Sequence, residues 1–316
     1  MKLSFEDEEK YSLDLLFFFR PHKEITKRRN GDIFLDGLII INKEKGFTSN
    51  DVVQIIKKKF NEKEGHTGTL DPMATGVLPI LVGKGTLLSK YLINHDKIYT
   101  ATVKLGIKTD TGDITGNIIE KKDVPNDCFK EDKLIEILKK MNGVQQQIPP
   151  MYSAIKVNGR KLYEYARNGQ RIDVTPRIIN IYATELIELS EKNNEITFRV
   201  SCSKGTYIRT LCETLAEMLG TVGTMCELNR EKVGEFRIEQ SVKINDLKKE
   251  DIIPIERFMI NNSEIILLQK ELIAFINGVK LVYNKNDGIY RIYDLNKKFI
   301  GIGKINQGFL KRDIVI

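Results

Sequence analysis

One aspartate lies in a segment whose residue types could support covalent chemistry. Asp71 is in the glycine-rich stretch Gly65–Pro79, which reads GHTGTLDPMATGVLP. Pro72 disfavours the helical conformation for the residue before it, and the glycines allow another backbone to approach closely. The stretch lacks the Gly-Lys-Ser/Thr ending of a phosphate-binding P-loop. Asp71 can therefore be a turn-forming residue, as in many Asp-Pro pairs, or a reactive carboxylate held in a loop.

A second candidate is Arg209, in the segment Lys204–Arg209. The residues after this segment predict a helix, because Ile208, Leu211, Cys212, Leu215 and Leu219 share one face and Gly220 follows. A cation in the first turn opposes the helix dipole at a cost of roughly a few tenths of a kcal/mol. A carboxylate partner such as Asp71 would explain this placement, although an arginine that points into solvent is equally compatible with it.

The composition is typical of a globular protein and gives little support for a metal site. The chain has 316 residues, of which 41% are hydrophobic and 29% charged. The apolar run Leu15–Phe19 is too short to span a membrane and follows acidic residues, unlike a signal peptide. We therefore expect a cytoplasmic protein without a membrane partner. The four cysteines contain no C-x-x-C pair and the three histidines are scattered, so we expect no metal and no cofactor.

Basic residues concentrate between Lys156 and Arg177. The chain has a net charge of +7, which is compatible with a polyanionic partner or with a solvated surface. This segment contains six basic residues and only two acidic ones, and Tyr163 and Tyr165 lie between the basic residues. Cations interleaved with aromatic rings are typical of a surface that follows RNA phosphates and stacks bases.

The elements that would position these residues follow from periodicity. We expect a strand over residues 38–41, a helix capped by Thr48 and Asp51, and a loop over residues 65–85. Alternation predicts strands over residues 99–105 and 196–202, with Tyr99 facing the core, and helical spacing predicts a helix over residues 131–141. A strand pair over 289–293 and 299–302 belongs to a β-rich C-terminal part. Hairpin signals outnumber βαβ units, which favours an α+β fold.

Five segments, in order along the chain, resemble motifs of one enzyme family. Gly65–Pro79 resembles the active-site motif of the TruB family, which makes pseudouridine at position 55 in the T loop of tRNA. Four further segments are similar to its N-terminal motif, its second motif, its RNA-gripping insertion and its arginine motif: Asn42–Asp51, Lys97–Ala101, Pro149–Lys156 with Lys161–Arg167, and Cys202–Leu211. The sequence departs from the family at Glu44, where proline is common, and at Asn229, which interrupts a Leu-Arg-Arg pattern.

This resemblance implies a domain organisation. We expect an N-terminal extension over residues 1–31, which has no counterpart in the family. A catalytic domain over 32–248 would have the pseudouridine-synthase fold, with a mixed, largely antiparallel central sheet flanked by helices and an RNA-gripping insertion at about 148–180. A small C-terminal β-rich domain over 249–316 is similar to PUA domains.

The resemblance also implies roles for individual residues. Asp71 would be the nucleophile, Arg209 would pair with it and keep it ionised, and Tyr99 would contact the flipped uridine and help to remove its C5 proton. The supporting residues would be Tyr207 and Leu228 in the pocket wall, Lys43 behind the Asp71 loop, and His66 in the space that the base leaves. Lys156, Arg160, Lys161 and Arg167 would hold the RNA backbone. The expected partner is the tRNA T stem-loop, bound by a monomer.

Three alternatives remain at this point. A noncatalytic RNA-binding protein, such as a tRNA-folding chaperone, could use the same scaffold, although Asp71, Tyr99 and Arg209 together favour catalysis. A uridine-modifying enzyme could act on ribosomal RNA instead, although the insertion favours the tRNA T loop. A metal- or nucleotide-dependent enzyme is disfavoured because ligand clusters and phosphate loops are missing from the sequence.

Overall fold

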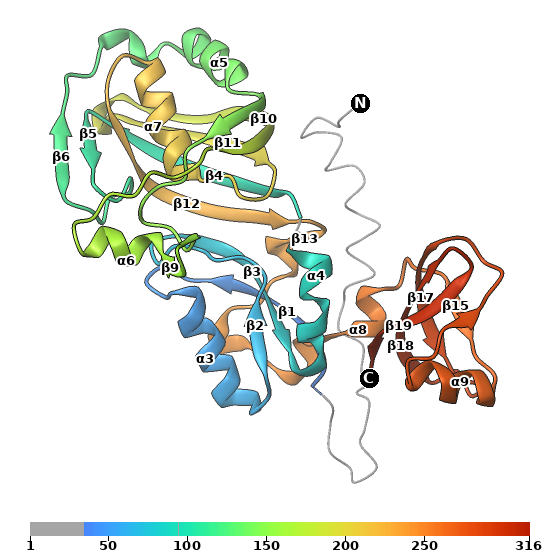
Figure 1. Cartoon of the computed structure of the whole chain (residues 1–316). Coiled ribbons are helices and arrows are strands. Elements are labelled where there is room, and N and C mark those ends of the chain that lie inside the picture. The colour runs from blue at the N-terminus through green and yellow to red at the C-terminus, as the bar shows by residue number, and fades with distance from the viewer. Residues whose placement is uncertain (1–34, 94) are drawn as a thin grey trace.

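The computed structural model describes residues 35–93 and 95–316 (Figure 1). The predicted N-terminal extension, residues 1–31, lies outside the described residues. In the described part, a ten-stranded sheet forms the larger body of the molecule and a five-stranded sheet forms a smaller one near the C-terminus (Figure 1). No helix of the described ranges is long and apolar enough to cross a membrane.

The central sheet is mixed and almost entirely antiparallel. Its main strand order is β14-β1-β3-β12-β4-β11-β10-β7, while β2 pairs with β3 and β13 with β12. Only β12 and β3 are parallel, through the pairs Asn229↔Thr75 and Arg230↔Gly76. This confirms the predicted α+β sheet. Its strands are β1 (Gly37–Lys43), β2 (Glu64–His66), β3 (Thr75–Val82), β4 (Lys97–Leu105), β7 (Gly143–Gln147), β10 (Arg177–Ser190), β11 (Glu195–Cys202), β12 (Gly223–Val233), β13 (Phe236–Arg237) and β14 (Ile253–Pro254).

The two faces of this sheet are covered by different elements. On β1, Ile39 and Ile41 point into one core, and Leu38 and Ile40 point into the other, as the period of two in a strand requires. The first core includes the apolar faces of α3, α5 and α7. The second includes side chains from α4, α8 and the C-terminal sheet. The helices are α3 (Ser49–Phe60), α4 (Ser89–Leu92), α5 (Glu131–Lys140), α6 (Leu162–Arg167), α7 (Ile208–Met218), α8 (Ile255–Phe258) and α9 (Gln269–Ile276).

Helix α3 begins where the sequence predicts. The amide of Asp51 donates to Thr48 Oγ1 at 3.0 Å, and the amide of Thr48 donates to Asp51 Oδ2 at 2.8 Å. These two bonds form the capping box, which satisfies main-chain donors that the first turn leaves free. The strands predicted over residues 38–41, 99–105 and 196–202 and the helix over 131–141 are likewise confirmed as parts of β1, β4, β11 and α5.

The loop predicted over residues 65–85 is wrong for most of its length. Thr75–Val82 is strand β3, and all but its first residue are buried. Glycine and proline usually signal turns, yet Pro79 lies within the strand opposite Ile40. Burial of Val77, Leu78 and Ile80 between the two cores outweighs the low strand propensity of Gly76 and Pro79. Only the segment between β2 and β3 remains a loop, and it contains Asp71.

The C-terminal sheet has the order β15-β17-β18-β19-β16. Its strands β17 and β18 pair antiparallel and confirm the strand pair predicted over 289–293 and 299–302. Ile302 and Ile314 pack into the second core, and the Asp313 side chain accepts hydrogen bonds from Lys90 and Tyr91 of α4. Because β14 pairs with β1 and the second sheet starts only at Glu264, the division at residues 248 and 249 stays a prediction. The strands are β15 (Glu264–Ile266), β16 (Leu281–Val282), β17 (Gly288–Tyr293), β18 (Phe299–Asn306) and β19 (Phe309–Val315).

Two short hairpins project from the central sheet. Strands β5 (Ile107–Thr109) and β6 (Ile118–Lys121) form the first hairpin, which follows β4. Strands β8 (Lys156–Val157) and β9 (Arg160–Lys161) form the second, directly before α6. The second hairpin carries part of the basic segment identified in the sequence.

Candidate active site

Asp71 is held in a loop whose main chain is fixed on both sides of this residue. Ser49 Oγ accepts a bond from the Leu70 amide at 2.8 Å and donates to the Leu70 carbonyl at 3.1 Å. On the other side of Asp71, the Pro72 carbonyl accepts bonds from the Gly46 amide at 2.8 Å and from Lys43 Nζ at 3.3 Å. The residues next to the carboxylate therefore have fixed positions before any substrate binds.

Arg230 binds the main chain at the start of the same loop. This arginine on β12 is 1% exposed, and its guanidinium donates to the carbonyls of Val77 at 2.8 Å and Gly68 at 3.0 Å. It also reaches the carbonyl of Thr69 at 3.4 Å. The main chain of Arg230 approaches Gly76 so closely that a Cβ there would lie 2.2 Å from the Arg230 carbonyl oxygen. Glycine at 76 is therefore needed where β12 and β3 meet.

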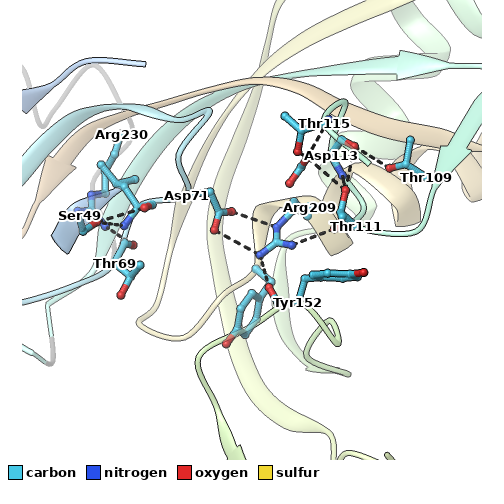
Figure 2. A network of polar contacts seen from close by, with 12 residues as sticks. Ser49, Thr69, Asp71, Thr109, Thr111, Asp113, Thr115, Tyr152, Arg209 and Arg230 are labelled. Carbon is cyan, nitrogen blue, oxygen red and sulfur yellow. Dashed lines mark hydrogen bonds and ion pairs between the residues drawn. The ribbon is translucent and has the colours of Figure 1, made fainter. Parts of the chain in front are cut away.

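Arg209 and Asp71 form an ion pair, which is the arrangement that the family resemblance implies (Figure 2). The Arg209 Nε lies 3.0 Å from Asp71 Oδ2, and its Nη2 donates to Oδ1 at 3.4 Å. The guanidinium also donates to the main-chain carbonyls of Thr111 at 2.9 Å and Tyr152 at 2.8 Å. The Arg209 side chain is 6% exposed and that of Asp71 is 31% exposed, so the arginine is fixed and the carboxylate is reachable.

The Thr111 carbonyl that meets Arg209 belongs to a turn organised by Asp113 (Figure 2). Asp113 Oδ1 accepts bonds from the Thr115 amide at 3.0 Å and the Thr115 hydroxyl at 2.5 Å, and lies 3.2 Å from the Thr111 hydroxyl. The Thr109 hydroxyl donates to the Asp113 carbonyl at 2.7 Å. These bonds fix the turn between β5 and β6, and with it the acceptor that orients Arg209.

The turn before α7 is fixed by one buried amide side chain. Gln147, the last residue of β7, accepts from the Tyr207 amide at 2.8 Å and donates to the Tyr207 carbonyl at 3.1 Å. Tyr207 is the residue that precedes the first turn of α7. Gln147 therefore helps to set where that helix starts and where Arg209 emerges from it.

Burial and nearby charges shift the ionisation of this site. Burial raises the pKa of the Asp71 carboxyl above its usual value, whereas Arg209 and Lys43 oppose the shift. Burial lowers the pKa of Lys43 to about 8. Burial also raises the pKa of Tyr99, and the charge of Arg230 opposes that shift. The two cations nearest the carboxylate thus favour its ionised form, and the Tyr99 phenol is protonated at neutral pH.

A cleft of about 650 Å³ opens beside the ion pair. Five of the residues predicted from the sequence line it: Asp71, Tyr99, Tyr207, Arg209 and Leu228. They come from the loop after β2, from β4, from α7 with its preceding turn, and from β12. A cavity of this size with one reachable carboxylate, an aromatic ring and apolar walls can hold a nucleotide.

Apart from the four basic residues predicted to hold the RNA backbone, two predicted residues, Lys43 and His66, do not line the cleft. Lys43 is fully buried and contacts the carbonyls of Glu44, Phe47 and Pro72 instead. His66 lies on β2 opposite Ile80, and its Nδ1 is buried without a hydrogen-bond partner. Burial lowers the pKa of His66, which favours the neutral ring. The role predicted for His66 in RNA stays a prediction.

The basic insertion forms a hairpin and a short helix beside the cleft. Tyr163 of α6 lines the cleft, with Lys161 Nζ 5.3 Å and Arg167 Cζ 5.4 Å from its ring centroid. Lys156, Arg160 and Arg167 are exposed, as a phosphate-binding surface requires. The ring is thus held among cations at the mouth of the cleft.

Sequence reasoning missed several residues that shape this site. In the sequence, Arg230, Ser49 and Tyr152 stand out only as parts of motifs or strands, and Thr111 and Asp113 only as turn residues. A weak signal exists for Arg230, because an arginine follows Leu228 at the strand period and so shares its buried face. Over residues 35–93 and 95–316 no group of three or more His, Cys, Asp or Glu side chains could hold a metal ion.

Comparison with known proteins shows which family the chain resembles. Three family models match in succession: "TruB family pseudouridylate synthase (N terminal domain)" at 55–208, "tRNA pseudouridylate synthase B C-terminal domain" at 209–257 and "Pseudouridine synthase II TruB, C-terminal" at 263–311. The tRNA pseudouridine synthase B of Francisella philomiragia subsp. philomiragia is 43% identical over 298 residues, covering 89% of this chain and 97% of that protein. The protein of the same name from Clostridium kluyveri is 40% identical over 286 residues, covering 87% and 97%.

Solved structures support the fold. A chain in the crystal structure of a Cbf5-Nop10-Gar1 complex is similar with a TM-score of 0.61 and 24% identity, covering 90% of this chain and 86% of that one. A chain in an H/ACA RNP bound to a substrate RNA containing 2′-deoxyuridine gives a TM-score of 0.60 at the same identity and coverage. These likenesses confirm the expected pseudouridine-synthase fold. With the family models and the curated relatives, they establish that this chain belongs to the TruB family of pseudouridylate synthases.

Proposed function

We propose that this enzyme isomerises the uridine at position 55 in the T loop of tRNA to pseudouridine, with Asp71 as the nucleophile. The observation that carries the proposal is a single carboxylate, paired with Arg209 at 3.0 Å and 31% exposed, at the wall of a cleft large enough for a nucleotide. The relatives named tRNA pseudouridine synthase B support tRNA as the substrate class.

The reaction needs only one nucleophile. The C1′–N1 bond breaks, the uracil rotates, and a C1′–C5 bond forms while C5 loses its proton and N1 gains one. Asp71 acts by covalent catalysis, which divides one difficult step into easier ones. Glycosidases need two carboxylates because they also activate water. Here the detached base is itself the second reactant, so no water, redox partner or acceptor molecule enters the balance.

The neighbours of Asp71 have complementary tasks. Arg209 favours the ionised carboxylate and fixes its direction through two N–H groups. The Tyr99 ring and Leu228 pack against the uracil. Since burial raises the pKa of Tyr99, removal of the C5 proton by its hydroxyl depends on Arg230, whose charge makes the phenolate less costly. Lys43 keeps the Asp71 loop in place through the Pro72 carbonyl.

RNA reaches the cleft past the basic insertion. The target base must leave its stack, which costs roughly a few kcal/mol. Lys156, Arg160, Lys161 and Arg167 bind phosphates of the T stem-loop and offset that cost. His66 fills the space that the base leaves, which requires the RNA to approach β2, since this side chain does not line the cleft. The enzyme acts as a monomer in the cytoplasm, where its tRNA substrate is.

Pseudouridine mapping in a T-arm RNA tests the proposal. Purified wild type, with no cofactor added, should convert position 55, and Asp71→Asn should lower the rate by about 10³-fold or more while largely keeping RNA affinity. Asp287→Asn is a matched control, because Asp287 accepts a bond from the Gln307 amide near the C-terminal sheet and does not line the cleft. Turnover by Asp71→Asn at the wild-type rate would reject the nucleophile. Conversion at another uridine, or only in ribosomal RNA, would reject the T-loop assignment.

A further inference from the structure

A buried lysine lies in the wall of the cleft with no task in the reaction described above. Lys97 is the first residue of β4 and is 8% exposed. Its ammonium group donates to the His95 carbonyl at 2.5 Å, and within residues 35–93 and 95–316 it forms no ion pair. Lys97 also lines the cleft beside Asp71 and Tyr99. A charged side chain is thus partly removed from water where the substrate binds.

Among the described residues, no carboxylate forms an ion pair with Lys97, although the charge of Asp96 acts on it. The cleft wall carries one carboxylate, Asp71, and Arg209 is already paired with it. Arg230 and Lys204 lie near Lys97 and add positive charge, whereas Asp96 opposes them. Burial lowers the pKa of Lys97 to about 8, which reflects the cost of keeping an unpaired ammonium out of water. An anion bound in the cleft would remove that cost.

The position of Lys97 suits the phosphate of a nucleotide whose base lies at Tyr99. Residues 97 and 99 are two apart on β4 and so point to the same face of the sheet. The strand rise separates them by about 7 Å along the sheet. A nucleotide spans this distance between its base and its own phosphates, so a uracil against Tyr99 leaves a phosphate near the ammonium.

We propose that Lys97 binds one of the two phosphates that flank the flipped uridine. This assignment rests on the proposed function, because it takes a uridine of RNA as the occupant of the cleft. Its consequence is that the flipped nucleotide is held at both ends, with the base against Tyr99 and the phosphate on Lys97. The basic insertion outside the cleft would then hold other phosphates of the same RNA.

The test neutralises one phosphate at a time. T-arm RNAs carry a methylphosphonate on the 5′ or the 3′ side of the target uridine, with a 2′-O-methyl group on the nucleotide before it to protect the linkage. Each is compared with the same 2′-O-methyl RNA containing an ordinary phosphate. Wild type should lose about tenfold or more in affinity at one of the two linkages, as expected for a charge-assisted hydrogen bond.

Two variants separate the charge of Lys97 from its structural bond. Lys97→Met removes the charge and the donor, whereas Lys97→Gln removes the charge but keeps a donor for the His95 carbonyl. Both should bind ordinary RNA more weakly than wild type and show no further loss with the methylphosphonate. Lys97→Arg should keep the loss. Lys104→Met is the matched control on the same strand, because Lys104 pairs with Glu195 instead of lining the cleft.

Each result of these binding experiments either supports or rejects the contact between Lys97 and a phosphate. It is overturned if neither methylphosphonate weakens binding to wild type, or if folded Lys97→Gln, checked by its melting curve, shows the full wild-type loss. A lower salt dependence in Lys97→Gln, by about 0.7 in the log–log slope, supports it further. Pseudouridine formation by wild type reports the proposed function separately. No pseudouridine together with a Lys97-dependent loss rejects the reaction and keeps the phosphate site.

Discussion

Arg209 is the residue whose replacement most directly tests how Asp71, the proposed nucleophile, is held. Its guanidinium makes two contacts with Asp71 and one each with the carbonyls of Thr111 and Tyr152. Arg209→Lys keeps the positive charge but replaces a planar fork by a single ammonium group, which cannot reach all four acceptors. Arg209→Met removes the charge as well. The pair of variants separates geometry from electrostatics.

The size of the effect follows from the hydrogen bonds. A hydrogen bond to a charged group contributes about 1.5–3 kcal/mol, so losing one of the two N–H groups on Asp71 in the transition state should slow the reaction about 10- to 150-fold. Arg209→Met should slow it further. It also removes a charge that lowers the pKa of Asp71, so the acidic limb of its rate profile should move to higher pH.

Single-turnover pseudouridine formation, with enzyme in excess over T-arm RNA, measures this effect on the chemical step. Binding of the same RNA should change little, because the Arg209 side chain is only 6% exposed. Arg199→Lys is the matched control, since Arg199 pairs with Glu231 at 2.9 Å and neither side chain lines the cleft. The reasoning fails if Arg209→Lys reacts within twofold of wild type, or if its defect disappears when more RNA is supplied.

Three further predictions rest on the same structure. Wild-type kcat/KM should fall as the pH is lowered through the pKa of Asp71, and the fall should begin at a higher pH than for an exposed aspartate, because burial raises that pKa; a profile that is flat down to pH 4 would contradict this. Ser49→Ala should lower the free energy of unfolding by about 1–3 kcal/mol in urea titrations, since it leaves the amide and carbonyl of Leu70 without their partner; an unchanged midpoint would mean that water replaces the hydroxyl. Replacing Arg160 and Lys161 by glutamine should reduce the log–log salt slope of RNA binding by about 0.7 for each phosphate that the variant no longer binds; an unchanged slope would remove them from the RNA surface.

The parts of this structure that sequence could predict depend on nearby residues. The capping box of α3 joins two residues that are three apart in the sequence. The alternation of apolar and polar residues that places Tyr99 on the core side lies within one strand. The pairing of Arg209 with Asp71 is also accessible, although they lie 138 residues apart. An arginine in the first turn of a helix is locally unfavourable, which is compatible with a nearby anion or with a solvated side chain, and the resemblance to the TruB arginine motif then implies Asp71 as its partner.

The parts that sequence missed depend on contacts between distant segments. The sequence of strand β3 predicts a loop because glycine and proline have low strand propensity. They are tolerated because β3 pairs with β1, β2 and β12, and these pairings join distant segments. Arg230 reaches a carbonyl 162 residues away, and no local pattern signals an acceptor at that distance. The same holds for the Thr111 carbonyl, which becomes a partner of Arg209 only after the β5–β6 turn is in place.

Two buried cations both support the Asp71 loop and supply positive charge to the site. Lys43 and Arg230 are fully buried, and both donate to main-chain carbonyls on either side of Asp71. A neutral donor could satisfy these carbonyls equally well. Two cations in the same places also oppose the effect of burial, since Lys43 lowers the pKa of Asp71 and the Arg230 charge lowers that of Tyr99. A loop held by cations can therefore bury its carboxylate in part and still favour the ionised form that the proposed nucleophile needs.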